Sequence, residues 1–181
     1  MATTILLARH GETDWNREHR VQGHTDRPLN DTGRAQALAL AESLAGEPLD
    51  AVYASDLGRA VDTARAVADP RGLPVTTLHD LREKNFGTWE GQTDEEILHR
   101  FPDASRGHWG DGETNEAMAG RVVAALRTIA ERHPGGRVLV VSHGGPLRAV
   151  LHHCSAVADG PIENCHVARL EIEDGDLRWL D

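Results

Sequence analysis

Two arginines and two histidines each follow the end of a short apolar run in this sequence: Arg9, His10, Arg59 and His143. A guanidinium group offers a planar fork of donors that suits the oxygens of a phosphate group. A neutral imidazole can act as a covalent nucleophile, and its ordinary pKa of about 6.5 keeps much of it neutral at cellular pH. Together these side chains could bind a tetrahedral dianion and attack it, provided that a carboxylic acid protonates the leaving oxygen.

These arginines and histidines must be positioned by the strands and helices that precede them. The spacing of apolar residues along the chain predicts strands that alternate with helices. Apolar and β-branched runs predict strands at 3–8, 49–53, 74–78 and 138–141. Helical apolar spacing and end signals predict helices at about 30–45, 57–68, 94–100, 114–132 and 146–153. Segments 167–173 and 177–180 flank Asp174-Gly175, which is typical of a hairpin. The polar segment 10–30 is expected to form a long loop.

This alternation favours an α/β fold, a three-layer αβα sandwich with a mostly parallel central sheet and an antiparallel strand from the C-terminal hairpin. Ligands bind beyond the carboxyl ends of the strands in such sheets, which is where the arginines and histidines fall. The helix starts near Arg59 and Gly144 are expected to add backbone N–H groups. A length of 181 residues suits one domain, 1–181, with a small cap-like segment at about 84–113.

Composition and charge exclude several classes of partner. The net charge of −10 disfavours nucleic acid and anionic membranes, so we expect a small phosphorylated metabolite, with a homodimer as an open alternative. Cys154 and Cys165 are expected to be buried free thiols in a reducing compartment. The N-terminus does not have the pattern of a signal peptide, and no apolar run reaches membrane-spanning length, so the expected location is cytoplasmic.

The chain resembles the histidine phosphatase superfamily, which includes the cofactor-dependent phosphoglycerate mutases. Arg9-His10-Gly11-Glu12 resembles the family's RHG motif, and further matches follow in the family's order. These matches are Gln22–Leu29, Thr32–Ala37, Ser55–Ala60, Leu81–Glu83 with Phe86–Gly91, and Val141–Gly145. Ordered motifs across nearly the whole chain are far more specific than a lone tripeptide.

The resemblance implies a role for each matched residue. His10 is the expected nucleophile, phosphorylated at Nε2, and Glu83 is the expected proton donor that later activates water. The groups expected to hold the phosphoryl oxygens are Arg9, Arg59 and His143. The residues expected to line the phosphate or its approach are Asn16, Gln22, Gly23 and Gly144. The resemblance implies no metal and no cofactor. The histidines expected to be solvated are His19, His24, His79, His99, His108, His133 and His166, whereas His152 and His153 are expected to be structural.

Several alternatives stay open. Glu12, Asp14 and Glu90 compete with Glu83 as the acid. A catalytically silent phosphate-binding module would keep the fold without the chemistry, although His10, Arg59, Glu83 and His143 are all present. A metallohydrolase built on the many histidines lacks the H-x-x-x-H spacing.

The resemblance also leaves a choice between a phosphatase and a mutase. The family's mutases carry a basic insertion after the acid motif. Here the segment before the long helix is short, and its basic residues are Lys84, Arg100 and Arg106. This favours a small, broad-specificity phosphatase that acts through a phosphohistidine on His10, with a cofactor-dependent phosphoglycerate mutase as the alternative. Sugar phosphates, phosphoglycerate derivatives and nucleotide-loop precursors of cobalamin are candidate substrates.

Overall fold

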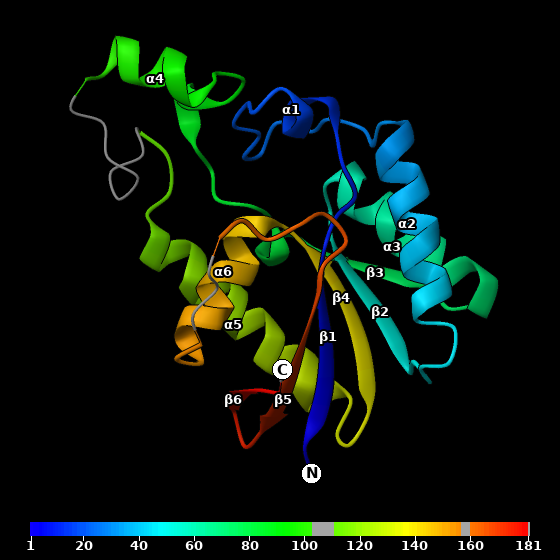
Figure 1. Cartoon of the computed structure of the whole chain (residues 1–181). Helices are drawn as coiled ribbons and strands as arrows, with labels where there is room; N and C mark the ends of the chain where they lie inside the picture. The colour runs from blue at the N-terminus through cyan, green and yellow to red at the C-terminus, as the bar shows by residue number, and fades with distance from the viewer. Residues whose placement is uncertain (103–110, 157–159, 181) are drawn as a thin grey trace.

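A computed structural model describes residues 1–102, 111–156 and 160–180. Its centre is a six-stranded sheet in the order β3-β2-β4-β1-β5-β6 (Figure 1). The strands are β1 (Thr3–Arg9), β2 (Ala51–Ser55), β3 (Val75–Leu78), β4 (Arg137–Ser142), β5 (Val167–Glu173) and β6 (Asp176–Trp179). The first four strands along the chain pair in parallel, whereas β5 is antiparallel to β1 and β6 is antiparallel to β5. The predicted mostly parallel sheet with an antiparallel C-terminal hairpin is therefore confirmed.

The two central strands are apolar because both of their faces are covered. In β1, Ile5 and Leu7 pack into one core and Leu6 and Ala8 into the other. Strand β4 divides its residues between the same two cores in the same way. Alternate side chains of a strand point to opposite faces, so such a continuous apolar run indicates helices on both sides.

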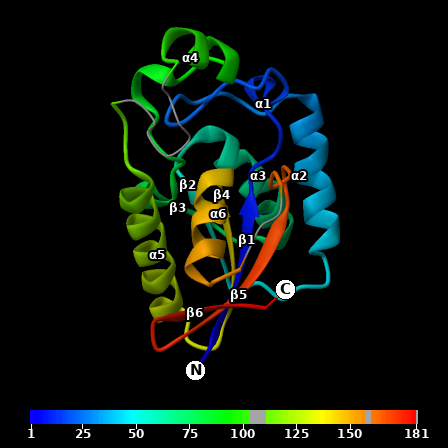
Figure 2. The same ribbon diagram turned by 60° about the vertical axis from the view of Figure 1, so that its left-hand side comes forward.

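Helices cover both faces, which confirms the predicted three layers. One face carries α2 (Asp31–Ser43) and α3 (Gly58–Ala68), and the other carries α5 (Asn115–Arg132) and α6 (Gly144–His153), as Figure 2 shows. Side chains cap the first N–H groups of two of these helices: Asn30 accepts from Gly33 N and Thr114 accepts from Ala117 N.

Two short helices, α1 (Asp14–Arg17) and α4 (Asp94–Arg100), lie at the end of the molecule toward which β1 points (Figures 1 and 2). The prediction that 10–30 is loop throughout is wrong at α1. Thr13 caps Asn16 N and the Asn16 side chain returns to Thr13 N, a capping box that starts the helix. A helix of 4 residues is too short to have an apolar period, so only its cap could have revealed it.

The segment predicted to be a cap is tied to the loop that follows β1. Gly91 N donates to Val21 O (2.7 Å) and Val21 N donates to Gln92 O (3.0 Å). Helix α4 begins with a second capping box, formed by Thr93 and Glu96. Arg106 and the rest of 103–110 lie outside the described residues, so the predicted cap at about 84–113 stays a prediction.

Cys154 and Cys165 are free, as expected, but both are half-buried rather than buried. Three short 3-10 helices complete the described structure, at Asp69–Arg71, His79–Leu81 and Gly87–Trp89. None of the helices within 1–102, 111–156 and 160–180 has both the length and the apolar character that a membrane crossing requires.

Candidate active site

The carboxyl ends of the parallel strands bring the predicted arginines and histidines together. Arg9 is the last residue of β1 and His10 follows it, Arg59 lies in the first turn of α3, and His143 is the residue before α6. His10, Arg59 and His143 are at most 3% exposed. The rings of His10 and His143 meet edge to face, with their centroids 5.1 Å apart.

Two hydrogen bonds fix the tautomer of His10. Its Nδ1 lies 2.7 Å from Gly11 O, which can only accept a hydrogen bond, so Nδ1 carries the proton. Its Nε2 lies 3.3 Å from Arg59 Nε, which can only donate. Nε2 therefore presents a lone pair, the state that a nucleophilic histidine needs.

Electrostatics keep both histidines neutral. Burial, followed by the positive charges of Arg59 and Arg9, holds the pKa of His10 well below its ordinary value. Burial is also the main reason that the pKa of His143 lies well below its ordinary value. Burial lowers the pKa of Arg9 and of Arg59 as well, and the negative charge of Glu83 works in the opposite direction on both.

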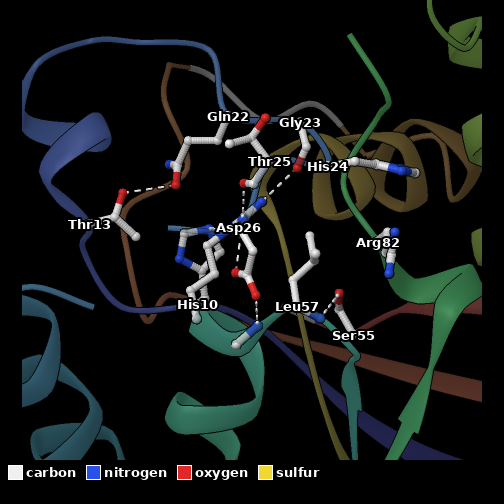
Figure 3. A network of polar contacts seen from close by, with 12 residues as sticks. His10, Thr13, Gln22, Gly23, His24, Thr25, Asp26, Ser55, Leu57 and Arg82 are labelled. Atoms are coloured by element: carbon white, nitrogen blue, oxygen red, sulfur yellow. Dashed lines mark hydrogen bonds and ion pairs between the residues drawn. The ribbon is translucent and has the colours of Figure 1, made fainter. Parts of the chain in front are cut away.

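Arg59 is held by the loop that follows α1. Its Nη2 donates to Gly23 O (2.8 Å) and its Nη1 donates to Thr25 O (3.0 Å), while Asp26 lies 3.7 Å from Nη1. Figure 3 shows these loop residues beside His10. A side chain that is fully buried and donates in three directions has one position, so Arg59 is a fixed charge next to His10 Nε2.

Three buried nitrogen atoms next to His10 make no hydrogen bond within the described part of the chain: Arg9 Nε and both ring nitrogens of His143. Arg9 is otherwise anchored through Nη1, which donates to Ile162 O. Leaving buried polar atoms unpaired is costly, and such atoms are a common mark of a ligand site. Because they lie close to the ring of His10, the arrangement suits an electrophilic anion.

At each of the helix starts near Arg59 and Gly144, one backbone N–H group already donates to a carboxylate. In α3, Gly58 N donates to Asp26 Oδ2 (2.8 Å). In α6, Gly145 N donates to Glu83 Oε2 (3.1 Å). Side chains from distant loops thus occupy N–H groups that the sequence suggested for phosphate.

Glu83, the predicted acid, lies beside this centre, and its negative charge is the largest carboxylate influence on the pKa of both Arg9 and Arg59. Its bond to Gly145 N places it at the start of α6, two residues from His143. The competing acids are engaged elsewhere. Glu12 accepts from Asn30 Nδ2 (2.8 Å) and Asp14 pairs with Arg17 (2.8 Å). Glu90 accepts from three backbone N–H groups and a hydroxyl.

The residues predicted to line the phosphate lie at the rim of this centre. Thr13 joins two of them, because its hydroxyl donates to Gln22 Oε1 (2.9 Å) and lies 3.1 Å from Asn16 Oδ1. Gly23 contributes its carbonyl to Arg59, and Gly144 lies beside the guanidinium of Arg9. Their contacts to a phosphate stay a prediction.

Sequence reasoning missed the structural roles of Glu90 and His24. Glu90 fixes the loop that holds Arg59: Oε1 accepts from His24 N and Oε2 accepts from Thr25 N, both at 2.8 Å. His24 is half-buried rather than solvated, and its Nε2 lies 3.0 Å from Glu83 O. Both residues lie in segments that match family motifs, but these roles depend on partners about 60 residues away in the chain.

A groove of about 860 Å³ opens from Glu83 and Gly145 and runs between the first half of α5 and α6. Phe86, Met118 and Ala149 give it apolar walls, and Lys84 is the basic residue next to the acid. Lys84 is 3% exposed, donates to Asn115 Oδ1 (2.9 Å) and lies over the Phe86 ring. The other described basic residue of this segment, Arg100, lies over the ring of Phe101 at the end of α4.

Among the described residues, no group of three His, Cys, Asp or Glu side chains is placed to hold a metal ion. The charged groups that act on His10 are the guanidinium groups of Arg59 and Arg9, and the Glu83 carboxylate in turn acts on both guanidinium groups. A metal-independent site stays a prediction of the sequence.

Residues 5–181 match the family described as the histidine phosphatase superfamily (branch 1). The chain belongs to this superfamily. The family predicted from the ordered motifs is thereby confirmed, and the convergence described above lies on a histidine phosphatase scaffold.

Named relatives of this chain include phosphatases and a mutase-like protein. It is 39% identical to a metal-independent phosphoserine phosphatase of Arabidopsis thaliana, over 98% of this chain and 79% of that protein. It is 38% identical to phosphoglycerate mutase-like protein 4 of the same plant, over 97% of this chain and 81% of that protein. A solved mycobacterial glucosyl-3-phosphoglycerate phosphatase superposes with a TM-score of 0.86 at 29% identity, covering 99% of this chain and 96% of that one.

Proposed function

We propose that this histidine phosphatase hydrolyses small phosphate monoesters in two steps through a phosphohistidine on His10. The observation that carries the proposal is the set of unpaired buried nitrogens, Arg9 Nε and the His143 ring, beside the lone pair of His10 Nε2. The family and its phosphatase relatives support a phosphatase.

In the first step, His10 Nε2 bonds to phosphorus while the ester P–O bond breaks. Arg9, Arg59 and His143 stabilise the negative charge on the phosphoryl oxygens. Glu83 gives its proton to the leaving oxygen, and the leaving group occupies the groove that starts at Glu83.

In the second step, a water molecule replaces the leaving group. The Glu83 carboxylate takes a proton from this water as its oxygen bonds to phosphorus and the P–N bond breaks. Inorganic phosphate leaves, and both His10 and Glu83 return to their starting protonation states. Neutral His10 suits both steps, because burial and the neighbouring arginines favour the unprotonated ring.

The proposal favours water over a second substrate as the phosphoryl acceptor. A mutase must hold the carboxylate of phosphoglycerate with fixed cations and protect its phosphohistidine from water. Lys84 and Arg148 line the groove, but the Lys84 ammonium already donates to Asn115 Oδ1 and Arg148 Nη2 donates to Gly160 O. This arrangement supports hydrolysis of a small phosphorylated metabolite. Action in the cytoplasm, the cap role of about 84–113 and a homodimer remain parts of the proposal.

The first experiment combines phosphate release with trapping of the intermediate. We expect wild-type protein to release phosphate from a panel of monoesters in the presence of a chelator. Rapid quenching with labelled ester should yield an adduct that is labile in acid and stable in base. His10→Ala should lose the adduct and lower kcat/KM by about 10⁴-fold or more, the scale seen when a nucleophile is removed.

Two controls make this test decisive. His166→Ala alters an exposed histidine and should leave phosphate release and the adduct unchanged. The alternative is tested with 3-phosphoglycerate and 2,3-bisphosphoglycerate. Efficient conversion to 2-phosphoglycerate with negligible phosphate release would replace the phosphatase by a mutase, and a His10→Ala variant with wild-type activity would contradict both.

A further inference from the structure

The segment that carries Glu83 has no strand or helix of its own between Arg82 and Phe86. A carboxylate that must meet a leaving oxygen needs a defined position, so its backbone has to be held by other means. Four consecutive carbonyl groups, those of residues 80–83, each accept a hydrogen bond from a side chain. Ser142 Oγ donates to the carbonyl of Leu81 (2.7 Å).

A single side chain, Arg121 of α5, serves the other three carbonyls. Its Nη1 donates to Asp80 O (2.9 Å) and to Arg82 O (2.7 Å), and its Nη2 donates to Glu83 O (2.8 Å). The remaining two N–H groups hold Glu113: Nε donates to Oε1 and Nη2 donates to Oε2, both at 2.7 Å. All five donors of the guanidinium are therefore used.

The pair formed by Arg121 and Glu113 is well shielded, with side chains 16% and 17% exposed. Glu113 also extends the contact beyond Glu83, because Glu113 N donates to Asn85 O (2.8 Å). A bidentate pair holds the guanidinium plane in one orientation, and that plane sets where the three carbonyls lie.

We propose that Arg121 is a positioning residue for the general acid, and that Glu113 orients it. This inference rests on the proposed function of Glu83. Arg121 makes no hydrogen bond to His10 or to the arginines among its described contacts. Its charge is only the smallest of the causes that lower the pKa of His143, so its main action is on the position of Glu83.

The test uses the dependence of the rate on the leaving group. A good leaving group departs without a proton, whereas a poor one needs the acid in place. The measured quantity is kcat/KM for a series of aryl phosphates from 2,4-dinitrophenyl phosphate to phenyl phosphate. This ratio covers the steps up to departure of the leaving group, so slow hydrolysis of the phosphohistidine does not mask the effect.

We expect Arg121→Met to lower kcat/KM by about 10²-fold for phenyl phosphate, the scale of a misplacement of about 1 Å. The loss for 2,4-dinitrophenyl phosphate should be within about 3-fold. Arg121→Lys keeps a cation beside Glu113 without the fork of donors, so it should fold and show the same dependence on the leaving group. Glu113→Gln should show a weaker dependence on the leaving group, because the three hydrogen bonds from Arg121 to the backbone carbonyls remain.

The matched control is Arg127→Met, on the same helix, where the exposed arginine donates to Gly175 O (2.7 Å). It should match the wild type on every ester. If Arg121→Met does not fold, the kinetics of Arg121→Lys on the same esters decide whether the loss depends on the leaving group. A loss by the same factor on all esters, or no loss at all, overturns the inference. Failure of the proposed function would look different, because wild type would then release no phosphate or His10→Ala would stay active.

Discussion

The proposed site has two ends: the phosphate end, formed by His10, Arg59 and His143, and the acid end, formed by Glu83. The two ends are held by different kinds of structure. His10, Arg59 and His143 project from a strand end and two helix starts, where the backbone is set by the sheet. Glu83 lies on an irregular segment whose carbonyl groups are held by side chains from β4 and α5. Regular structure thus fixes the proposed nucleophile, whereas long-range side-chain bonds fix the proposed proton donor.

This difference predicts two distinct signatures on substitution. Changes at the phosphate end should slow every ester alike, because every ester has the same phosphoryl group. Changes at the acid end should slow esters with poor leaving groups most. Variants from the two ends can therefore be told apart by one series of aryl phosphates, whatever the physiological substrate is.

The largest effect that separates the two ends is expected at Arg59. Arg59→Met removes a buried charge that lies 3.3 Å from His10 Nε2, so kcat/KM should fall by about 10²–10³-fold, the cost of one preorganised donor. The factor should be the same for phenyl and dinitrophenyl phosphate. Circular dichroism and thermal unfolding check that the variant folds.

Arg65→Met is the matched control for Arg59, because Arg65 lies on the same helix with its side chain 61% exposed. Its kinetics should equal those of the wild type. If Arg59→Met slowed phenyl phosphate far more than dinitrophenyl phosphate, Arg59 would belong to the acid end and the comparison would fail.

The next largest effect on kcat/KM is expected for a substitution of Glu83. Glu83→Gln keeps an acceptor for Gly145 N but carries no transferable proton, so it should lower kcat/KM for phenyl phosphate by about 10²-fold or more. Dinitrophenyl phosphate should be cleaved nearly as fast as by the wild type. Glu12→Gln, a change at a competing carboxylate, should leave the leaving-group dependence unaltered, and the reverse result would move the acid from Glu83 to Glu12.

The phosphate end was accessible to sequence reasoning because its residues follow strands. Apolar runs reveal β1 and β4, and parallel strands direct the residues behind them, His10 and His143, to one edge of the sheet. The family resemblance supplied Glu83. The groups that hold these residues were not accessible: Arg121 looks like an ordinary helix arginine, and its partners at 80–83 lie about 40 residues away.

The sequence suggested free N–H groups at the helix starts for the same reason, because it does not show contacts between residues far apart in the chain. The start of α6 could be predicted from the sequence, but its bond to the Glu83 side chain depends on a contact 62 residues apart in the chain. Helix α1 escaped detection because its signal is only a cap at Thr13. Local patterns thus predicted elements and their ends, while tertiary side-chain bonds required the structure.

The smallest expected effect is on the pH dependence of the free energy of unfolding, which differs between the phosphate end and the acid end. Burial lowers the pKa of His10 and of His143, so below about pH 6.5 the unfolded chain binds more protons than the folded one. The free energy of unfolding should therefore decline as the pH falls from about 6.5 toward the lower folded pKa values. At the acid end, burial alone would raise the pKa of Glu113, but the Arg121 hydrogen bonds and charge hold it below its ordinary 4.5. The contribution of ionised Glu113 to the stability of the folded state is present above about pH 4.5 and is lost only at lower pH.

Urea unfolding at about pH 7.5 and about pH 5.5 samples the histidine window, to which His24 also contributes because burial lowers its pKa. A substitution of His10 is therefore needed to single out the phosphate end. His10→Asn removes one of the two buried neutral rings, so its free energy of unfolding should decline less than that of the wild type between the two pH values. His79→Asn changes a histidine whose side chain is 62% exposed and should decline as the wild type does. A His10→Asn variant as pH-sensitive as the wild type would mean that the phosphate end does not hold His10 neutral, and the proposed nucleophile would lose its electrostatic basis.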